Sequence, residues 1–333
     1  MRIAVLLILL SRPFSSLFAA EDPVQMSQKL RMEGDYAQAE KILRAALENG
    51  DAASATRAVL LNTLGDLLRE QDRCAEARPL FEQVLKMENL AWRPRFSALV
   101  GLAEIHRQSH EWTGSMAEWT EARGMAESHD NSLLATVAIR GEGETWLDRG
   151  DTARAEPLLK KAVYLLENDS QAPRFRLAVA LGSLATLYRL ENKLAMAEEL
   201  WGRELKIDRE LMGNYHPQTA LVMGHLAEAW AADGDYERAR DYSHQVLDIM
   251  ESHFQHISTA VASALINDGL IEQHARNYAA AADRYSQALG IVRSSSSVSG
   301  SEAAMVSRLY QSALSQAPHS HGTKQINGFT KDK

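Results

Sequence analysis

Apolar residues recur along most of this chain at steps of three and four, which is the spacing of a helix with one buried face. Leu61, Leu64 and Leu68 form one such stripe, and a second stripe with Leu80 and Val84 follows it closely. The same succession of two stripes returns from about residue 21 to about residue 290. Because the connections between the stripes are short, the pattern predicts pairs of antiparallel helices.

A series of small residues indicates that these helix pairs are repeats. We call the small residue near the start of each second stripe the anchor, and successive anchors are 38 to 42 residues apart. A bulky residue stands four positions after most anchors and sixteen positions before most of them. The anchors of the seven units are Ala39, Ala77, Ser115, Ala155, Ala197, Ala239 and Ala281. The residues twelve positions before them are also small: Ser27, Gly65, Ala103, Gly143, Ala185, Ala227 and Gly269.

This spacing has a physical reason. A small residue from each helix at the crossing lets the two axes approach, while the bulky residues fill the space on either side. Each helix pair still leaves one apolar face uncovered, because it has only one partner inside the pair. The next pair must cover that face, so the sequence predicts an all-α protein in which about seven helix pairs stack in a row.

The connection inside each pair has a signal of its own. Five positions before the anchor, Gly34, Gly150, Asn192 and Gly234 stand in four of the seven units. Glycine and asparagine are the residues that best adopt the left-handed backbone found where a helix ends. We therefore expect each first helix to end at this position.

Some positions depart from the pattern. Glu204 occupies a slot that is usually apolar, and Ser243 replaces a bulky filler. Glu142, Asp268 and Glu272 stand where leucine or tyrosine is expected. The pattern is therefore weakest in the fourth and seventh units.

The order of a bulky residue, a small one four positions later, an alanine twelve after that and an aromatic four further on resembles the tetratricopeptide repeat. The last three units have a period of 42 and a helix that continues to Gly213, followed by Tyr215, His216 and Pro217. They resemble the kinesin-light-chain type of that family. The resemblance implies a right-handed α-solenoid whose first helices line a concave groove that holds an extended peptide or a partner helix.

Helical geometry selects the residues that would face this groove, because the stripe opposite the second helix lies fifteen, eleven and eight positions before the anchor. These candidate peptide-binding residues are Asn62, Asp66, Arg69, Glu104, Arg107, Arg140, Glu144, Arg189 and Glu228. The alternative interpretation is a solvated helix face with weak ion pairs between neighbours. The sequence departs from relatives of the family in two ways. The set of lysines and asparagines by which some tetratricopeptide domains bind a terminal carboxylate is not assembled. Gly182 and Gly224 also stand where the kinesin-light-chain type has asparagine.

Composition narrows the function. The formal net charge is −8, which disfavours nucleic acid as a partner because that affinity depends on neutralised phosphates. A single cysteine excludes an internal disulfide and any multi-cysteine zinc site. The sequence contains no glycine-rich phosphate loop and no catalytic motif, so we expect no enzyme activity, no cofactor and no metal. A non-catalytic scaffold that binds a protein or peptide is the first hypothesis, and a regulatory or assembly subunit of an exported enzyme or secretion complex is the alternative.

The two ends differ from the repeats. Residues 1–20 have a basic start, an apolar run from Ile3 to Leu10 and small residues at Ala19 and Ala20, which is typical of a secretory signal peptide. We therefore expect export to the periplasm or the medium, with a cytoplasmic location as the alternative, and no stable membrane span. The expected organisation is a repeat array over 21–292, a serine-rich linker over 293–301, a capping helix over 302–316 and a disordered tail over 317–333. The partner and the oligomeric state stay open.

Overall fold

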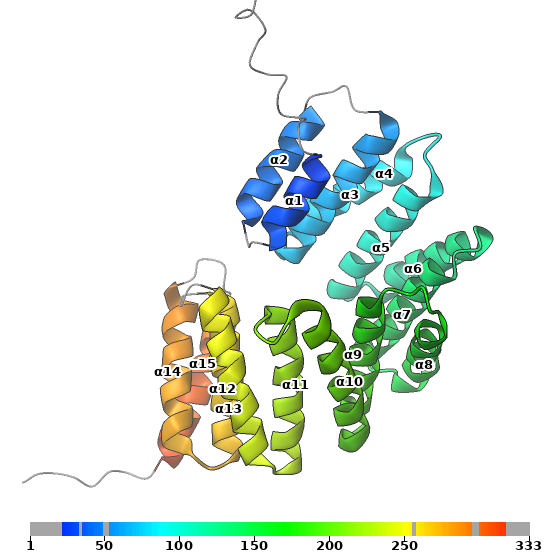
Figure 1. Cartoon of the computed structure of the whole chain (residues 1–333). Coiled ribbons are helices and arrows are strands. Elements are labelled where there is room, and N and C mark those ends of the chain that lie inside the picture. Colours follow the sequence, from blue (N-terminus) through cyan, green and yellow to red (C-terminus); the bar gives the residue numbers. More distant parts are fainter. Residues whose placement is uncertain (1–21, 33–34, 49–52, 255–257, 295–299, 318–333) are drawn as a thin grey trace, which may run out of the picture. The chain divides into compact units, whose positions relative to one another are not determined.

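The computed structural model describes residues 22–32, 35–48, 53–254, 258–294 and 300–317 (Figure 1). Within these residues the chain contains fifteen α-helices and no strand, which confirms the all-α prediction. The first helices of the seven pairs are α1 (Pro23–Met32), α3 (Ser54–Glu70), α5 (Trp92–Gln108), α7 (Ser132–Asp148), α9 (Arg174–Leu190), α11 (Pro217–Asp233) and α13 (Thr259–His274). The second helices are α2 (Tyr36–Glu48), α4 (Cys74–Lys86), α6 (Trp112–Ser128), α8 (Thr152–Asn168), α10 (Leu194–Met212), α12 (Tyr236–His253) and α14 (Tyr278–Ser294), and α15 (Gly300–Gln316) follows.

The chain divides into two compact units, Met1–Leu165 and Leu166–Lys333. In the first unit each helix from α1 to α6 packs on the next one along the chain, and the first helices α1, α3, α5 and α7 also contact one another in turn. In the second unit α9 to α15 pack in the same sequential way, and α11 contacts α13. Consecutive pairs within each unit therefore stack side by side, as the repeat pattern predicted.

The core of each pair forms at the predicted crossing. All seven anchors have no exposed surface, and the residues twelve positions before them are buried as well. The bulky fillers four positions after the anchors are buried too, and Trp119, Trp201, Tyr285 and Phe81 are the largest fully buried side chains. The packing at the crossing is close: a Cβ atom at Gly65 would lie 2.6 Å from Cζ of Phe81. Small and bulky residues alternate because the helices leave no other room.

The turn inside each pair uses the left-handed backbone in every unit where it is described. Gly150, Asn192 and Gly234 have φ values of +85°, +58° and +89°, as predicted. Gly34 lies outside the described residues. Asp72, His110 and Arg276 occupy the same position in other units with φ near +60°, although none of them is glycine or asparagine. The next residue donates its N–H to the carbonyl five positions back, as Arg73 does to Leu68 at 2.9 Å. The same backbone hydrogen bond therefore terminates the first helix in all of these units.

The irregular fourth and seventh units form complete helix pairs, because their buried acidic residues have cationic partners. Glu142 on α7 accepts a hydrogen bond from Arg123 on α6 at 2.8 Å. Asp268 on α13 lies 2.7 Å from Nε of Arg284 and accepts a hydrogen bond from Ser243 at 2.8 Å. Ser243 therefore replaces the usual bulky filler by a polar contact in the core.

The last helix covers the seventh pair. Val306 and Ala313 of α15 have no exposed surface, and Leu309 and Tyr310 pack against the cluster around Tyr285. Leu314, which the sequence pattern also assigned to this contact, is 40% exposed, because Ala313 takes the inward position instead. Helices α14 and α15 each extend two residues into the segment 293–301 that was expected to be a linker. Residues 1–20, 295–299 and 318–333 lie outside the described part of the chain. No helix of the described part is both long and apolar enough to cross a membrane.

Candidate peptide-binding faces

In the first unit the predicted residues lie on three neighbouring first helices. Helix α3 carries Asp66 and Arg69, α5 carries Glu104 and Arg107, and α7 carries Arg140 and Glu144. All six side chains are half-buried. Because α3, α5 and α7 contact one another in turn, their shared stripe forms one continuous surface, which we call the α3–α7 face.

Ion pairs connect the charges of the α3–α7 face. Nη2 of Arg107 lies 2.7 Å from Oε2 of Glu104, and Nη1 of Arg107 pairs with Asp148 on α7. Arg140 pairs with Glu144 within α7. Arg107 therefore links two first helices. Asp148, seven positions before its anchor, was missed in the sequence analysis because only three positions of the stripe were considered.

Burial and neighbouring charges shift the pKa values of two residues on this face. Desolvation opposes the charge of Arg107, but Glu104 and Glu144 outweigh it and raise the pKa of the guanidinium. Desolvation raises the pKa of Asp66 to about 6, while Arg69 acts in the opposite direction. The Asp66 side chain retains 42% of its exposure, so the neighbouring helices limit its hydration without removing it from solvent.

Asn62 has a different role from the other predicted residues. Its side chain is 6% exposed, and Nδ2 donates a hydrogen bond to the carbonyl of Pro94 at the start of α5, at 2.9 Å. The amide nitrogen of Asn62 therefore ties α3 to α5 and already has a partner.

The two predicted residues of the second unit are Arg189 on α9 and Glu228 on α11. Arg189 is exposed, and Oε1 of Glu228 accepts a hydrogen bond from Asn267 on α13 at 3.2 Å. Desolvation raises the pKa of Glu228, and Arg189 partly offsets that effect. Desolvation likewise lowers the pKa of His225, with Arg189 acting in the same direction.

Exposed apolar side chains extend the same stripe in the second unit. Val179 on α9 and Leu221 on α11 both lie eighteen positions before their anchors and are 41% and 50% exposed. Phe175, one turn earlier on α9, is 52% exposed. With Gly182 and Gly224, which also stand at equivalent positions of α9 and α11, these residues make up a set that we call the α9–α11 face. The sequence analysis missed the apolar part because the stripe was not followed one turn towards the helix start.

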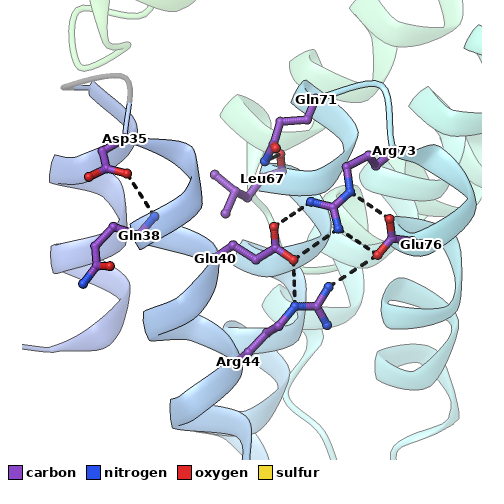
Figure 2. Close-up of polar contacts among 8 residues, drawn as sticks. All are labelled: Asp35, Gln38, Glu40, Arg44, Leu67, Gln71, Arg73 and Glu76. Carbon is purple, nitrogen blue, oxygen red and sulfur yellow. Dashed lines mark hydrogen bonds and ion pairs between the residues drawn. The ribbon is translucent and has the colours of Figure 1, made fainter. Parts of the chain in front are cut away.

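A further cluster of charges joins the second helices of the first unit (Figure 2). Glu40 on α2 lies 2.6 Å from Arg73 and 2.7 Å from Arg44, and Arg73 lies 2.8 Å from Glu76 on α4. Arg78 and Glu111 form an equivalent pair between α4 and the start of α6, at 2.9 Å. These half-buried and exposed pairs stabilise adjacent repeats only weakly, because solvent screens the attraction between their charges. They do not converge on a cavity, so we assign them to repeat stacking.

Among the residues described here, no three acidic, histidine or cysteine side chains gather in a way that could hold a metal ion. The arrangement that the described residues offer is two extended helix faces. The α3–α7 face presents paired charges of both signs, and the α9–α11 face presents apolar side chains beside charged ones. Both are suited to binding a chain segment.

A search of curated proteins found tetratricopeptide repeat protein 19, mitochondrial, from Rattus norvegicus, with 29% identity over 113 residues. The protein from Mus musculus matches at 28% over the same length. These matches cover 34% of this chain and 30% of each relative, so the chain matches less than a third of the length of these relatives.

Several solved structures have a similar fold. A chain of the APC/C hetero-tetramer Cut9-Hcn1 aligns with 89% of this chain and 49% of its own, with a TM-score of 0.62 and 16% identity. BtubC (BKLC) from P. vanneervenii aligns with 65% of this chain and 84% of its own, with a TM-score of 0.54 and 20% identity. A putative kinesin light chain of nearly identical TPR-like repeats from Podosopora anserina aligns with 59% of this chain and 94% of its own, with a TM-score of 0.51 and 17% identity. These similarities show the fold, including its likeness to kinesin-light-chain repeats.

Sequence models of the tetratricopeptide repeat match residues 26–88 and 176–252 in one case and residues 62–124 in another. Together the matched segments cover more than half of the 333 residues. Helix pairs, buried anchors and aromatic fillers described above lie within the matched segments. The chain therefore belongs to the tetratricopeptide repeat family.

Proposed function

We propose that this protein is a non-catalytic scaffold that binds an extended peptide or a partner helix along the first helices of its repeats. The observation that carries the proposal is the α3–α7 face, on which successive helices place half-buried charges of both signs at regular intervals. Tetratricopeptide proteins bind protein partners, which supports the same conclusion.

The pairing on the α3–α7 face explains how such a ligand would be recognised. Arg107 already makes two ion pairs, and a carboxylate of a bound segment could replace Asp148 as its partner. Glu104 and Glu144 can accept hydrogen bonds from the amides of an extended chain. The ligand would exchange internal ion pairs for new ones, so the face would contribute more to specificity than to affinity.

The test is capture of partners on the immobilised full-length chain, with the bound proteins quantified by mass spectrometry. We compare wild type with the double variant Arg107→Gln and Arg140→Gln. The neutral glutamine is preferred to a reversed charge, which would place a new carboxylate beside Glu104 and Asp148. The matched control changes two arginines outside the face, Arg78 and Arg154, to glutamine.

We expect the double variant Arg107→Gln and Arg140→Gln to capture less than a fifth of the amount of a specific partner that wild type captures. The control variant should capture nearly the same amount as wild type. Thermal unfolding of both variants should stay close to wild type. Equal recovery by the two variants would contradict the assignment of this face. Turnover of a substrate by purified protein, persisting after co-purified proteins are removed, would contradict the non-catalytic role.

We also propose that the protein is exported. The support is the pattern of residues 1–20, which lie outside the described part of the chain. Mass spectrometry of the native protein gives the test, because a mature N-terminus close to Glu21 supports export. An intact Met1 in a soluble cytoplasmic fraction would contradict it.

A further inference from the structure

Helix α10 buries two carboxyl groups that have no ion-pair partner among the described residues. Glu204 and Asp208 are 6% and 3% exposed and stand four positions apart, on one face of the helix. Oε2 of Glu204 and Oδ2 of Asp208 are buried and make no hydrogen bond within the described residues. Arg209, the arginine next in sequence, points its Nη2 towards the sulfur of Met223 instead, at 4.0 Å.

Every other buried acidic residue at an irregular position of the repeat pattern has an arginine beside it. The three pairs are Glu142 with Arg123, Asp268 with Arg284, and Glu272 with Arg240, at 2.7 to 3.0 Å. A buried carboxylate without a cation is strongly unfavourable, because it has lost its hydration. Glu204 and Asp208 are therefore the buried acidic pair for which the described residues supply no counter-charge.

The Glu204 carboxylate reaches the α9–α11 face. A Cβ atom at Gly182 of α9 would lie 2.6 Å from its Oε2, so the carboxylate fills the space that a side chain at position 182 would take. Gly224 is the equivalent residue of α11, and a Cβ atom there would meet nothing within 4 Å. The equivalent residues of other units are larger: Asn62, Val100, Arg140 and Ile266. At Gly182 the carboxyl group of Glu204 therefore stands where the face would otherwise carry a side chain, and at Gly224 the space beyond the backbone is open.

Exposed apolar side chains stand about one helical turn before each of these two glycines. Val179 lies three positions before Gly182, and Leu221 lies three positions before Gly224, so each is about one helical turn away on the same stripe. Both are exposed, at 41% and 50%. The α9–α11 face therefore combines apolar contact area with an uncompensated acidic group.

We propose that Glu204 and Asp208 form a subsite for a lysine or arginine side chain of the bound segment, while Val179 and Leu221 contact apolar residues beside that cation. The inference rests on the proposed function and specifies the chemistry of the ligand. Charge complementarity selects this occupant, since a cation is what the pair lacks. Because position 182 is glycine, no Cβ atom stands between the cation and the carboxyl group of Glu204.

The titration of Glu204 provides a signature of the subsite. Burial raises the pKa of Glu204 to about 8, with Asp208 acting in the same direction, and burial also raises the pKa of Asp208. On α9, Arg174 pairs with Glu210 and Arg176 is half-buried. Arg189 acts on two titratable groups of α11, His225 and Glu228. The remaining charged residue of α11, Asp233, is exposed near the end of the helix. A bound cation would hold Glu204 ionised, so binding at neutral pH would release a proton.

The test selects dodecamer peptides from a random phage-displayed library on the full-length protein. We expect wild type to enrich lysine or arginine, flanked by apolar residues, at least fivefold over the unselected library. A selected peptide is then synthesised with its basic residue intact and with glutamine in its place, and affinities are measured by fluorescence anisotropy from pH 6 to pH 9. The basic peptide should bind at least tenfold tighter than the glutamine peptide at pH 8, and its affinity should rise with pH.

The variant Glu204→Gln should lose both the preference for the basic peptide and the pH dependence, while Glu199→Gln, an exposed position of the same helix, should keep both. Gly182→Ala should weaken the basic peptide by displacing the carboxylate, and Gly202→Ala, which meets nothing within 4 Å, should not. Circular dichroism checks that each variant is folded. Retention of the basic preference by the double variant Glu204→Gln and Asp208→Asn would overturn the subsite. Selection of peptides without basic residues would also overturn it but leave the scaffold function standing, whereas selection of no peptide at all would count against both.

Discussion

The close contact between Gly65 and Phe81 makes the crossing of α3 and α4 a direct test of the repeat geometry. A Cβ atom at Gly65 would lie 2.6 to 3.0 Å from three atoms at the far end of the Phe81 ring. Phe81 has no exposed surface, and its ring is rigid, so it has no free space into which it can move. The substitution Gly65→Ala therefore forces either the ring or the helix axis to shift.

The expected size follows from two opposing effects. Alanine favours a helix over glycine by about 1 kcal/mol, whereas an additional methyl group in a filled core costs about 1–3 kcal/mol. Gly65→Ala should therefore lower the free energy of unfolding by about 1 kcal/mol. In a Phe81→Leu background the three contacting ring atoms are gone, so the same change should be neutral or stabilising. The coupling energy between the two positions should be about 1–3 kcal/mol.

The measurement is urea denaturation of the full-length chain, together with native-state hydrogen exchange of the α3 and α4 amides to localise the effect. Gly124→Ala is the matched control, because Gly124 lies within α6 and a Cβ atom there would meet nothing within 4 Å. It should stabilise the chain by up to about 1 kcal/mol. If Gly65→Ala stabilises the chain as Gly124→Ala does, or costs the same with Leu at position 81, the crossing is not packed as described.

Three further predictions concern stability and pH, and each is checked by thermal or urea denaturation. Arg276→Gly should raise the free energy of unfolding by about 0.5–1 kcal/mol. The reason is that Arg276 has a φ of +62°, which glycine adopts without strain. If the free energy of unfolding does not rise, the backbone at position 276 is not strained. Arg284→Met should lower the free energy of unfolding by about 3–5 kcal/mol, since buried Asp268 would lose its arginine partner and keep only the hydroxyl of Ser243 and, at 3.8 Å, His244. The double change with Asp268→Asn should recover part of the loss, and no recovery would contradict this origin. Wild type should lose stability as the pH rises from about 5 to about 8, because folded Glu204 keeps its proton up to a pKa of about 8 while the unfolded chain ionises near 4.5. Glu204→Gln should reduce this slope, most clearly between pH 6 and pH 8, because Asp66 with its pKa of about 6 contributes at lower pH; an unchanged slope would assign it to other groups.

The helix pairs and their core could be predicted from the sequence because they depend on spacing. Amino-acid composition does not identify the anchors from Ala39 to Ala281. Their fixed distance from the bulky fillers does, because it follows from how closely two helices cross. The turn position was predicted only where glycine or asparagine marks it. Asp72, His110 and Arg276 adopt the same left-handed backbone because the two packed helices impose it, and no local preference could have revealed that.

The candidate site could be predicted in outline only. Periodicity assigned Asp66, Glu104 and Arg107 to one stripe, and the structure places them on neighbouring helices of one face. Whether a charged side chain is free or already occupied depends on contacts between units that are far apart in sequence. Asn62 is occupied by Pro94, 32 residues away, and Arg107 by Asp148, 41 residues away, so neither contact follows from a stripe on a single helix.

The same reasoning explains why the irregular positions are the more informative part of this chain. An acidic residue in an apolar slot should be selected against unless something balances its buried charge. In the fourth and seventh units an arginine on a neighbouring helix does so, as Arg123 does for Glu142, and the irregularity then has a purely structural explanation. Glu204 has no such partner within the described residues, and its carboxyl group takes the place of a side chain at Gly182. A destabilising group that is left uncompensated, at a place where a ligand can reach it, is better explained by what binds there than by what holds the fold together.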